Sequence, residues 1–280
     1  MSGNLYVVAT PIGNLEDLTP RARQALADVD LIAAEDTRHT GRLLSHLGLK
    51  KRLIALHDHN EEQAVTKVIA ELEAGQSVAL VSDAGTPLVS DPGYRLLRAA
   101  HRHGITVSPM PGACAVTAAL SAAGLPTDRF CFEGFLPAKA VSRRKRLQSL
   151  MSESRTLVFF ESVHRIAAAL ADLGEVFGEE RDAFIGRELS KLHEQCVQGS
   201  LGSLRLKVDA GDIVSKGEFV IVVAGADVET ESTLDADTLL TELAKHLPGK
   251  DAAKVTAKLT GEKKNALYQR LLEIRRKSRK

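Results

Sequence analysis

The sequence lacks the features that mark several classes of protein. Its three cysteines, Cys114, Cys131 and Cys196, are odd in number, far apart and form no Cys-x-x-Cys pair, so they indicate neither a disulfide framework nor a zinc site. No apolar run approaches the ~20 residues of a membrane span, and no basic segment leads into an apolar one at the start. We therefore expect a folded protein of the reducing cytoplasm that does not bind a membrane.

Two common ligand-binding loops are absent as well. The chain contains no Gly-x-Gly-x-x-Gly fingerprint and no Walker lysine loop, which disfavours a dinucleotide or a triphosphate held at a glycine-rich helix start. Aromatic residues make up only 4% of the chain, which disfavours aromatic stacking as the main mode of nucleic-acid binding.

The composition and length are those of a globular protein with more than one domain. The hydrophobic fraction is 44% and the charged fraction is 26%, both ordinary values. A chain of 280 residues is long enough for two cores. The first part alternates short apolar runs with amphipathic segments, which predicts a mainly parallel sheet with helices on both faces. The predicted strands are residues 5–9, 31–34, 53–56, 77–81 and 105–107.

A turn at residues 124–127 separates this region from a second one with a different pattern. Here strands are predicted at residues 130–135, 156–160, 183–185, 195–198 and 219–223, with fewer helices between them. The predicted fold class is α/β. It has an N-terminal α/β domain (1–123), a second α+β domain with a mixed sheet (124–228) and a helical, basic C-terminal extension (229–280).

Three loops rich in small residues follow predicted strands and should meet at one edge of the first sheet. They are residues 10–14, 81–93 and 109–115. Ligands of open α/β sheets bind beyond the carboxyl ends of the strands, and small residues there let a ligand approach the backbone. Asp83 would point its carboxylate into this crevice. The alternative is that Asp83 only ends the strand and caps the next helix.

Polar segments at residues 35–39 and 57–60 follow two other strands and should face the same crevice. Their histidines, carboxylates and arginine could orient a ribose and accept a proton. Asp36 and Asn60 could equally cap the helices that follow them. His57 and His59 also suggest a metal, but the chain offers no further well-spaced ligands, so we expect no metal.

Basic residues gather in two places although the net charge is only +1. One cluster is Lys139 with residues 143–146, and the other is the chain from Lys250 onward. Such clusters suit a polyanion such as RNA. Each could instead be the solvated face of a helix that docks on the rest of the protein.

Several motifs together resemble the ribosomal small subunit methyltransferase I family, which belongs to the tetrapyrrole-methylase-like superfamily. The resemblance covers nearly the whole chain. It is carried by Thr10-Pro11-Ile12-Gly13-Asn14-Leu15, Ala34-Glu35-Asp36-Thr37-Arg38, His57-Asp58-His59-Asn60-Glu61, residues 82–93, Pro111-Gly112, Glu133-Gly134-Phe135-Leu136-Pro137 and Lys216-Gly217-Glu218.

The resemblance implies a homodimer that binds S-adenosyl-L-methionine in a cleft between two domains. It implies 2'-O-methylation of a cytidine in small-subunit (16S) ribosomal RNA, with the RNA or an assembled 30S particle as partner. The cofactor-binding residues that it suggests are Pro11, Asp83, Ala84, Gly85, Leu88, Ala113, Cys114, Phe160, Glu161 and Gly217.

For this reaction the candidates that orient or deprotonate the ribose hydroxyl are Asp58, His59 and Glu35. The candidates for RNA binding are Arg38, Arg143, Arg144 and Arg146. Three alternatives stay open. One is a tetrapyrrole methyltransferase, which the absence of a glycine-rich first loop disfavours. Another is an RNA-binding scaffold without catalysis. The third is a metal-dependent phosphoesterase that uses His57, Asp58, His59 and Asp83.

Overall fold

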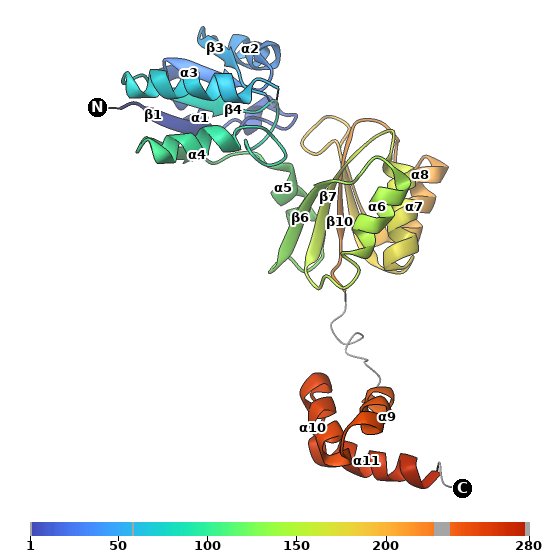
Figure 1. Cartoon of the computed structure of the whole chain (residues 1–280). Helices are drawn as coiled ribbons and strands as arrows, with labels where there is room; N and C mark the ends of the chain where they lie inside the picture. Colours follow the sequence, from blue (N-terminus) through green and yellow to red (C-terminus); the bar gives the residue numbers. More distant parts are fainter. Residues whose placement is uncertain (1, 58, 227–235, 278–280) are drawn as a thin grey trace. The chain divides into compact units, whose positions relative to one another are not determined.

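The computed structural model of the protein describes residues 2–57, 59–226 and 236–277, with side chains up to Ile274. The chain forms two compact units, residues 1–224 and residues 225–280 (Figure 1). The first unit contains two five-stranded sheets, and the second unit is helical in its described part. No helix among the described residues is long and apolar enough to cross a membrane.

The first sheet is entirely parallel, as expected from the alternation of strands and helices. Its strands are β1 (Asn4–Val8), β2 (Leu31–Ala34), β3 (Arg52–Ala55), β4 (Val78–Val81) and β5 (Thr106–Met110). They lie in the order β3-β2-β4-β1-β5. Strands β2 and β4 are buried at every position because helices cover both faces of the sheet.

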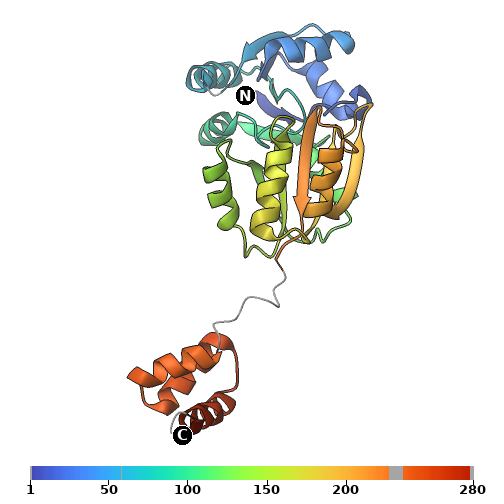
Figure 2. The same cartoon turned by 90° about the vertical axis from the view of Figure 1, so that its right-hand side faces the viewer.

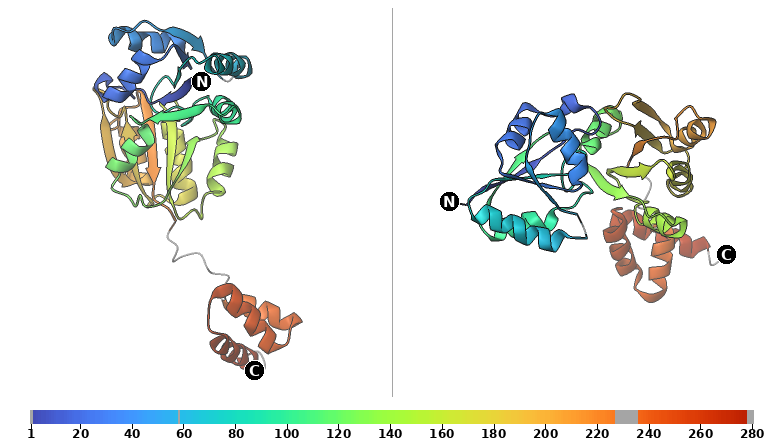
Figure 3. Two further views of the ribbon diagram at one scale, coloured as in Figure 1. Left: turned by 90° about the vertical axis from the view of Figure 1, so that its left-hand side faces the viewer. Right: turned by 90° about the horizontal axis from the view of Figure 1, so that it is seen from above.

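Four helices cover the two faces of this sheet (Figures 1 and 3). One face packs against α1 (Pro20–Asp28) and α2 (Thr37–His46), through Leu26, Leu44 and their neighbours. The other face packs against α3 (Glu61–Glu73) and α4 (Tyr94–Arg102), through Leu72, Leu96 and their neighbours. A short 3-10 helix, η1 (Leu15–Asp17), follows β1.

The second sheet is mixed, again as expected. It contains β6 (Phe130–Phe135), β7 (Thr156–Ser162), β8 (Asp182–Arg187), β9 (Gln195–Ser200) and β10 (Glu218–Val223), in the order β6-β7-β10-β8-β9. Only the β6–β7 pair is parallel. An apolar cluster on one face joins the sheet to α6 (Ala140–Gln148), α7 (Ile166–Phe177) and α8 (Leu201–Ala210). Figure 2 shows these helices lying along the sheet.

Helix α5 (Ala115–Ala122) connects the two sheets within the first unit. It follows the last strand of the first sheet, yet Val116 and Leu120 pack against Val158, Phe184 and Val220 of the second sheet. The other face of the second sheet is thereby covered by a helix that the sequence assigned to the first domain. The three-part division at residues 123 and 228 stays a prediction.

In its described part, the second unit is a group of three helices, as predicted for the C-terminal extension. Helices α9 (Ala236–His246), α10 (Gly249–Thr260) and α11 (Lys264–Lys277) share a small core of Ala236, Leu240, Ala252, Ala253, Leu267 and Leu271. Arg270 of α11 forms ion pairs with Asp237 of α9 and with Glu262, which precedes α11. The apolar face of α11, which contains Leu267 and Leu271, therefore docks within this unit.

Candidate functional site

The loops that follow β1, β4 and β5 are joined to one another, as the sequence suggests. The backbone N–H of Thr10 donates to the Gly85 carbonyl at 2.8 Å, and the N–H of Gly85 donates to the Thr10 carbonyl at 3.1 Å. The Thr86 hydroxyl donates to the carbonyl of Ala113 at 3.1 Å. The three loops therefore form one continuous surface at the carboxyl edge of the first sheet.

Glycine is required at two points where these loops approach each other. Gly85 has a φ of +84°, and a Cβ there would lie 3.2 Å from the Cγ2 atom of Ile12. At Gly112 a Cβ would lie 2.9 Å from the Cβ atom of Ala9. A larger residue at either position would force the loops apart, so the small residues set the shape of this edge.

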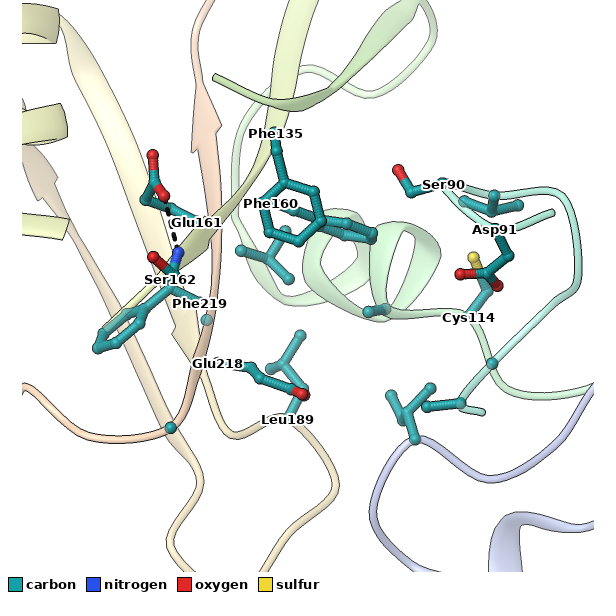
Figure 4. Close-up of a pocket in the computed structure, with 18 of the residues that line it drawn as sticks. Ser90, Asp91, Cys114, Phe135, Phe160, Glu161, Ser162, Leu189, Glu218 and Phe219 are labelled. Carbon is teal, nitrogen blue, oxygen red and sulfur yellow. Dashed lines mark hydrogen bonds between the residues drawn. The ribbon is translucent and has the colours of Figure 1, made fainter. Parts of the chain in front are cut away.

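A cavity of about 400 Å³ lies between these loops and the second sheet. In Figure 4 Glu161, Ser162, Glu218 and Phe219 lie on one side of it and Ser90, Asp91 and Cys114 on the other. The ring of Phe160 meets that of Phe132 edge to face at 4.8 Å and that of Phe135 at 5.6 Å. The cavity is thus mostly apolar with a few polar groups, which is the usual character of a small-molecule site of this size.

Six of the ten predicted cofactor-binding residues line this cavity. They are Ala84, Gly85, Cys114, Phe160, Glu161 and Gly217. They come from both sheets, so the structure brings together segments that are up to 133 positions apart in the chain, from Ala84 to Gly217. Cofactor binding by each of them stays a prediction.

The other four, Pro11, Asp83, Leu88 and Ala113, are not among the residues that line the cavity. The carboxylate of Asp83 accepts a hydrogen bond from the backbone N–H of Asp36 at 3.1 Å, and so ties the end of β4 to the end of β2. Leu88 has a φ of +73° and packs in the core under α4. Ala113 contributes its carbonyl oxygen to Thr86.

The carboxylate of Asp91 lines the cavity and was not singled out from the sequence, although it lies within the segment at residues 81–93. Its Oδ2 atom is buried and has no hydrogen-bond partner. Burial, together with the nearby carboxylates of Glu35 and Asp83, raises the pKa of Asp91 to about 6. The neighbouring Ser82 is also buried, and the interaction of its hydroxyl with Asp91 partly opposes this rise in pKa. The loop after β4 therefore places a carboxylate with a raised pKa, that of Asp91, in the wall of the cavity.

A second carboxylate, that of Glu161, lines the cavity from β7. Glu161 is 1% exposed, and its Oε1 atom lies 2.7 Å from Nη2 of Arg165 and accepts the backbone N–H of Ser162 at 2.8 Å. Its Oε2 atom is buried without a partner. A buried acceptor without a partner is costly, and a ligand that donates a hydrogen bond would satisfy it.

Of the three predicted catalytic residues, Glu35 and His59 are described, and neither lines the cavity. Glu35 lies beside the β4 loop, where its Oε2 atom is 3.4 Å from the backbone nitrogen of Asp83. His59 is exposed and follows β3, the edge strand of the sheet, and its ring lies 6.0 Å from that of His57. Asp58 lies outside the described residues. Their catalytic roles stay predictions.

The alternative roles considered for Asp36 and Asn60 have different outcomes. Asp36 caps α2, since its carboxylate accepts the backbone N–H of Arg38 at 2.8 Å. The hydrogen bonds from Arg38 also hold the pKa of Asp36 well below its usual value. Asn60 precedes α3 but makes no capping bond, because its side chain bonds the backbone of His57 and Ala55 instead. Among the residues that the structure describes, no group of three His, Cys, Asp or Glu side chains could hold a metal ion.

The arginines predicted to bind RNA are all engaged in ion pairs. Arg143 is buried, and its Nε atom lies 2.6 Å from Oδ2 of Asp172. Arg144 pairs with Asp172 and Glu175 on α7, Arg146 with Glu133 and Arg38 with Asp36. This placement favours a structural role for Arg143 in holding α6 on α7. RNA binding by these four arginines stays a prediction.

Comparison with known proteins assigns the chain to a family. Residues 4–205 match the family described as Tetrapyrrole (Corrin/Porphyrin) Methylases, and residues 230–275 match the family described as RsmI C-terminal HTH domain. Proteins named "Ribosomal RNA small subunit methyltransferase I" are similar over nearly the whole chain. The one from Escherichia coli O157:H7 is 52% identical over 97% of this chain and 95% of its own, and the one from Pseudomonas aeruginosa is 51% identical over 99% of both.

Solved structures similar to this one share its fold at low sequence identity. Uroporphyrin-III C-methyl transferase from Thermus thermophilus complexed with S-adenosylhomocysteine aligns with a TM-score of 0.55 and 19% identity, over 79% of this chain and 97% of its own. The cobalt precorrin-4 methyltransferase CbiF aligns with a TM-score of 0.59 and 17% identity, over 79% of this chain and 94% of its own. The aligned share is about the length of the two-sheet unit of residues 1–224.

Proposed function

This chain belongs to the ribosomal RNA small subunit methyltransferase I family, within the tetrapyrrole methylases, and from that premise we propose that it methylates small-subunit ribosomal RNA with S-adenosylmethionine as methyl donor. We propose further that the target is the 2'-hydroxyl of a cytidine. The observation that carries the proposal is the cavity formed by the strand-end loops of the first sheet and by β7 and β10 of the second. This cavity lies at the carboxyl edge of a parallel sheet, which is where open α/β folds bind their ligands.

The residues present fit S-adenosylmethionine. The cavity is large enough for a ligand of this class. Gly85 and Gly217 have no side chains, so a ligand can approach the backbone there. The rings of Phe135 and Phe160 suit an adenine ring. The buried Oε2 atom of Glu161 offers an acceptor to a donor group of the cofactor. When bound, the cofactor supplies a methyl group that a sulfonium centre has already activated. The chain therefore needs no metal, and its own task is to align the ribose oxygen and exclude water.

The hydroxyl that receives the methyl group must lose its proton, and Asp91 is our candidate to accept it. Asp91 lines the cavity, and its Oδ2 atom is free to accept a hydrogen bond. A base with a pKa near the working pH is effective, and the raised pKa of about 6 leaves Asp91 ionised at pH 7. Glu35 then acts through its charge, since it helps to raise the pKa of Asp91.

The second unit supports RNA as the substrate. Lys250, Lys254, Lys258, Lys263 and Lys264 are exposed and form no ion pair with another described residue. Free cations on one small helical unit bind phosphates without sequence preference. We propose that this unit holds the ribosomal RNA or the assembled 30S particle while the first unit methylates it.

Two measurements test the proposed function. Titration calorimetry with S-adenosylhomocysteine should show binding that EDTA does not change. Incubation of 30S particles with methyl-labelled cofactor, followed by digestion to nucleosides, should yield labelled 2'-O-methylcytidine. Absence of cofactor binding would contradict the proposal as a whole. Binding that EDTA abolishes and zinc restores would contradict the metal-free site, and a label on a base would contradict the 2'-hydroxyl as target.

A further inference from the structure

Helix α4 carries an exposed basic face beside the cavity. None of the residues that the structure describes covers this face. Tyr94, Arg98 and Arg102 follow one another at intervals of four, so they form one stripe along the helix. Tyr94 is 65% exposed, which is unusual for so large a ring. Together with Leu88, Leu97 and His101 the stripe lines an open groove on the surface of the first unit.

The positive charge of this face is free, whereas the charge on the neighbouring side of α4 is used internally. Arg95 forms an ion pair with Glu61 of α3 at 3.3 Å, and His103 lies 2.7 Å from Glu73 of α3. Arg98 and Arg102 form no ion pair with any residue that the structure describes. Helix α4 contains no acidic residue. The face is therefore suited to an anionic partner from outside the protein.

One loop connects this groove to the cavity. Residues 84–91 line the cavity through Ala84, Asp91 and their neighbours, while Leu88 of the same loop lines the groove. The positive φ values of Leu88 and Ser90 turn the backbone between the two sides. Asp91 and the first residue of α4 are separated only by Pro92 and Gly93. A chain lying on the α4 face is thus next to the wall of the cavity.

We propose that the Tyr94–Arg98–Arg102 face of α4 is the docking surface for the RNA segment whose nucleotide enters the cavity. The inference rests on the proposed function and adds to it the route by which the substrate arrives. The guanidinium groups of Arg98 and Arg102 bind successive phosphates, and the exposed ring of Tyr94 stacks on an unpaired base close to the cavity. A splayed single-stranded nucleotide is the form of RNA that such an arrangement accommodates.

Charge decides between RNA and a second copy of this chain as the occupant. In a twofold dimer through this face, the same patch of one protomer meets that of its partner. The arginines of both copies would then crowd together with no acidic residue on α4 to pair with them, which opposes association. A polyanion meets no such obstacle.

The experiment compares four full-length proteins in RNA binding across a salt series, with a small-subunit rRNA transcript as the probe. They are the wild type, Arg98→Glu/Arg102→Glu, Tyr94→Ala and the control Arg21→Glu/Arg23→Glu. The control makes the same change of charge on exposed residues of α1, which covers the opposite face of the same sheet. S-adenosylhomocysteine affinity and sedimentation velocity are measured for each protein.

We expect the α4 double variant to bind RNA at least tenfold more weakly and to reduce the log–log salt slope by about 1.4–1.8, since two phosphate contacts are lost. Tyr94→Ala should lose about 5- to 150-fold in affinity with little change in slope. Cofactor affinity should be unchanged in all four proteins. Equal RNA affinity of the α4 and α1 variants would overturn the inference, and so would a change of sedimentation coefficient confined to the α4 variants. A wild type that binds neither S-adenosylhomocysteine nor RNA would instead contradict the proposed function.

Discussion

Replacing Arg143 with methionine should destabilise the protein by about 3 kcal/mol, because the change leaves a buried carboxylate without its partner. Arg143 Nε lies 2.6 Å from Asp172 Oδ2, and the two side chains are only 5% and 9% exposed. Loss of one member of a buried ion pair typically costs 3–5 kcal/mol. We expect the lower end of this range because Arg144 also approaches Asp172, at 3.4 Å.

Arg144→Met is the matched control for this experiment. Arg144 lies on the same helix and contacts the same aspartate, but its side chain is 43% exposed. Exposed ion pairs contribute about 0–1 kcal/mol, so this variant should unfold at nearly the wild-type urea concentration. The double variant Arg143→Met/Asp172→Leu removes both charges and should recover most of the lost stability, since apolar residues replace a buried pair at little cost.

Urea unfolding followed by circular dichroism measures the free energy of unfolding of the wild type and the three variants. Calorimetry with S-adenosylhomocysteine checks that the cavity is intact. RNA affinity of the folded Arg143→Met protein should equal that of the wild type. The structural role of Arg143 is refuted if Arg143→Met and Arg144→Met lose equal stability, or if Arg143→Met keeps its stability while its RNA affinity falls.

Three further predictions concern the carboxylate of Asp91, two glycines with positive φ and the oligomeric state. Because its raised pKa keeps Asp91 protonated below about pH 6, the kcat/KM of methylation should rise from pH 5 to pH 7. The variant Asp91→Asn should lose most of the activity and this pH dependence, and it should keep its affinity for S-adenosylhomocysteine. Gly85→Ala and Gly104→Ala should each lose about 1–2 kcal/mol of stability because both glycines have positive φ, but only Gly85→Ala should weaken cofactor binding, since a Cβ at Gly104 meets nothing within 4 Å. We also propose that the protein is a homodimer, so sedimentation velocity should give twice the mass of one chain, and a single-chain mass would contradict this.

The strands could be predicted from the sequence because most of them are short apolar runs bounded by turn residues. All ten lie at or within a few residues of their predicted positions, including the edge strand β9, whose apolar content is small. The packing of α5 could not be predicted. Its apolar residues indicate a buried face but do not say which sheet buries it, and it packs on the second sheet although it follows the first in the chain.

The candidate site could be predicted at the level of loops but not of side chains. The rule that ligands bind at the carboxyl edge of a parallel sheet identifies the loop at residues 84–91, and that loop does line the cavity. Which of its residues face inward depends on backbone turns at Leu88 and Ser90, whose positive φ values no pattern of residue types revealed. The strand end therefore favoured Asp83, and the resemblance suggested both Asp83 and Leu88, whereas Asp91 lines the cavity.

The sequence also does not show which basic residues are paired with carboxylates in the folded protein. The dense run at residues 143–146 is the clearest positive cluster of the two-sheet unit in the sequence, yet Asp172, Glu175 and Glu133 neutralise most of it. The arginines of α4 are spread over eight positions and form no evident cluster, yet Arg98 and Arg102 pair with no carboxylate in the part of the chain that the structure describes. Pairing with acidic residues far along the chain decides which cations remain available to a polyanion. A surface that binds RNA is therefore better identified by the charges left after internal pairing than by the density of arginine and lysine in the sequence.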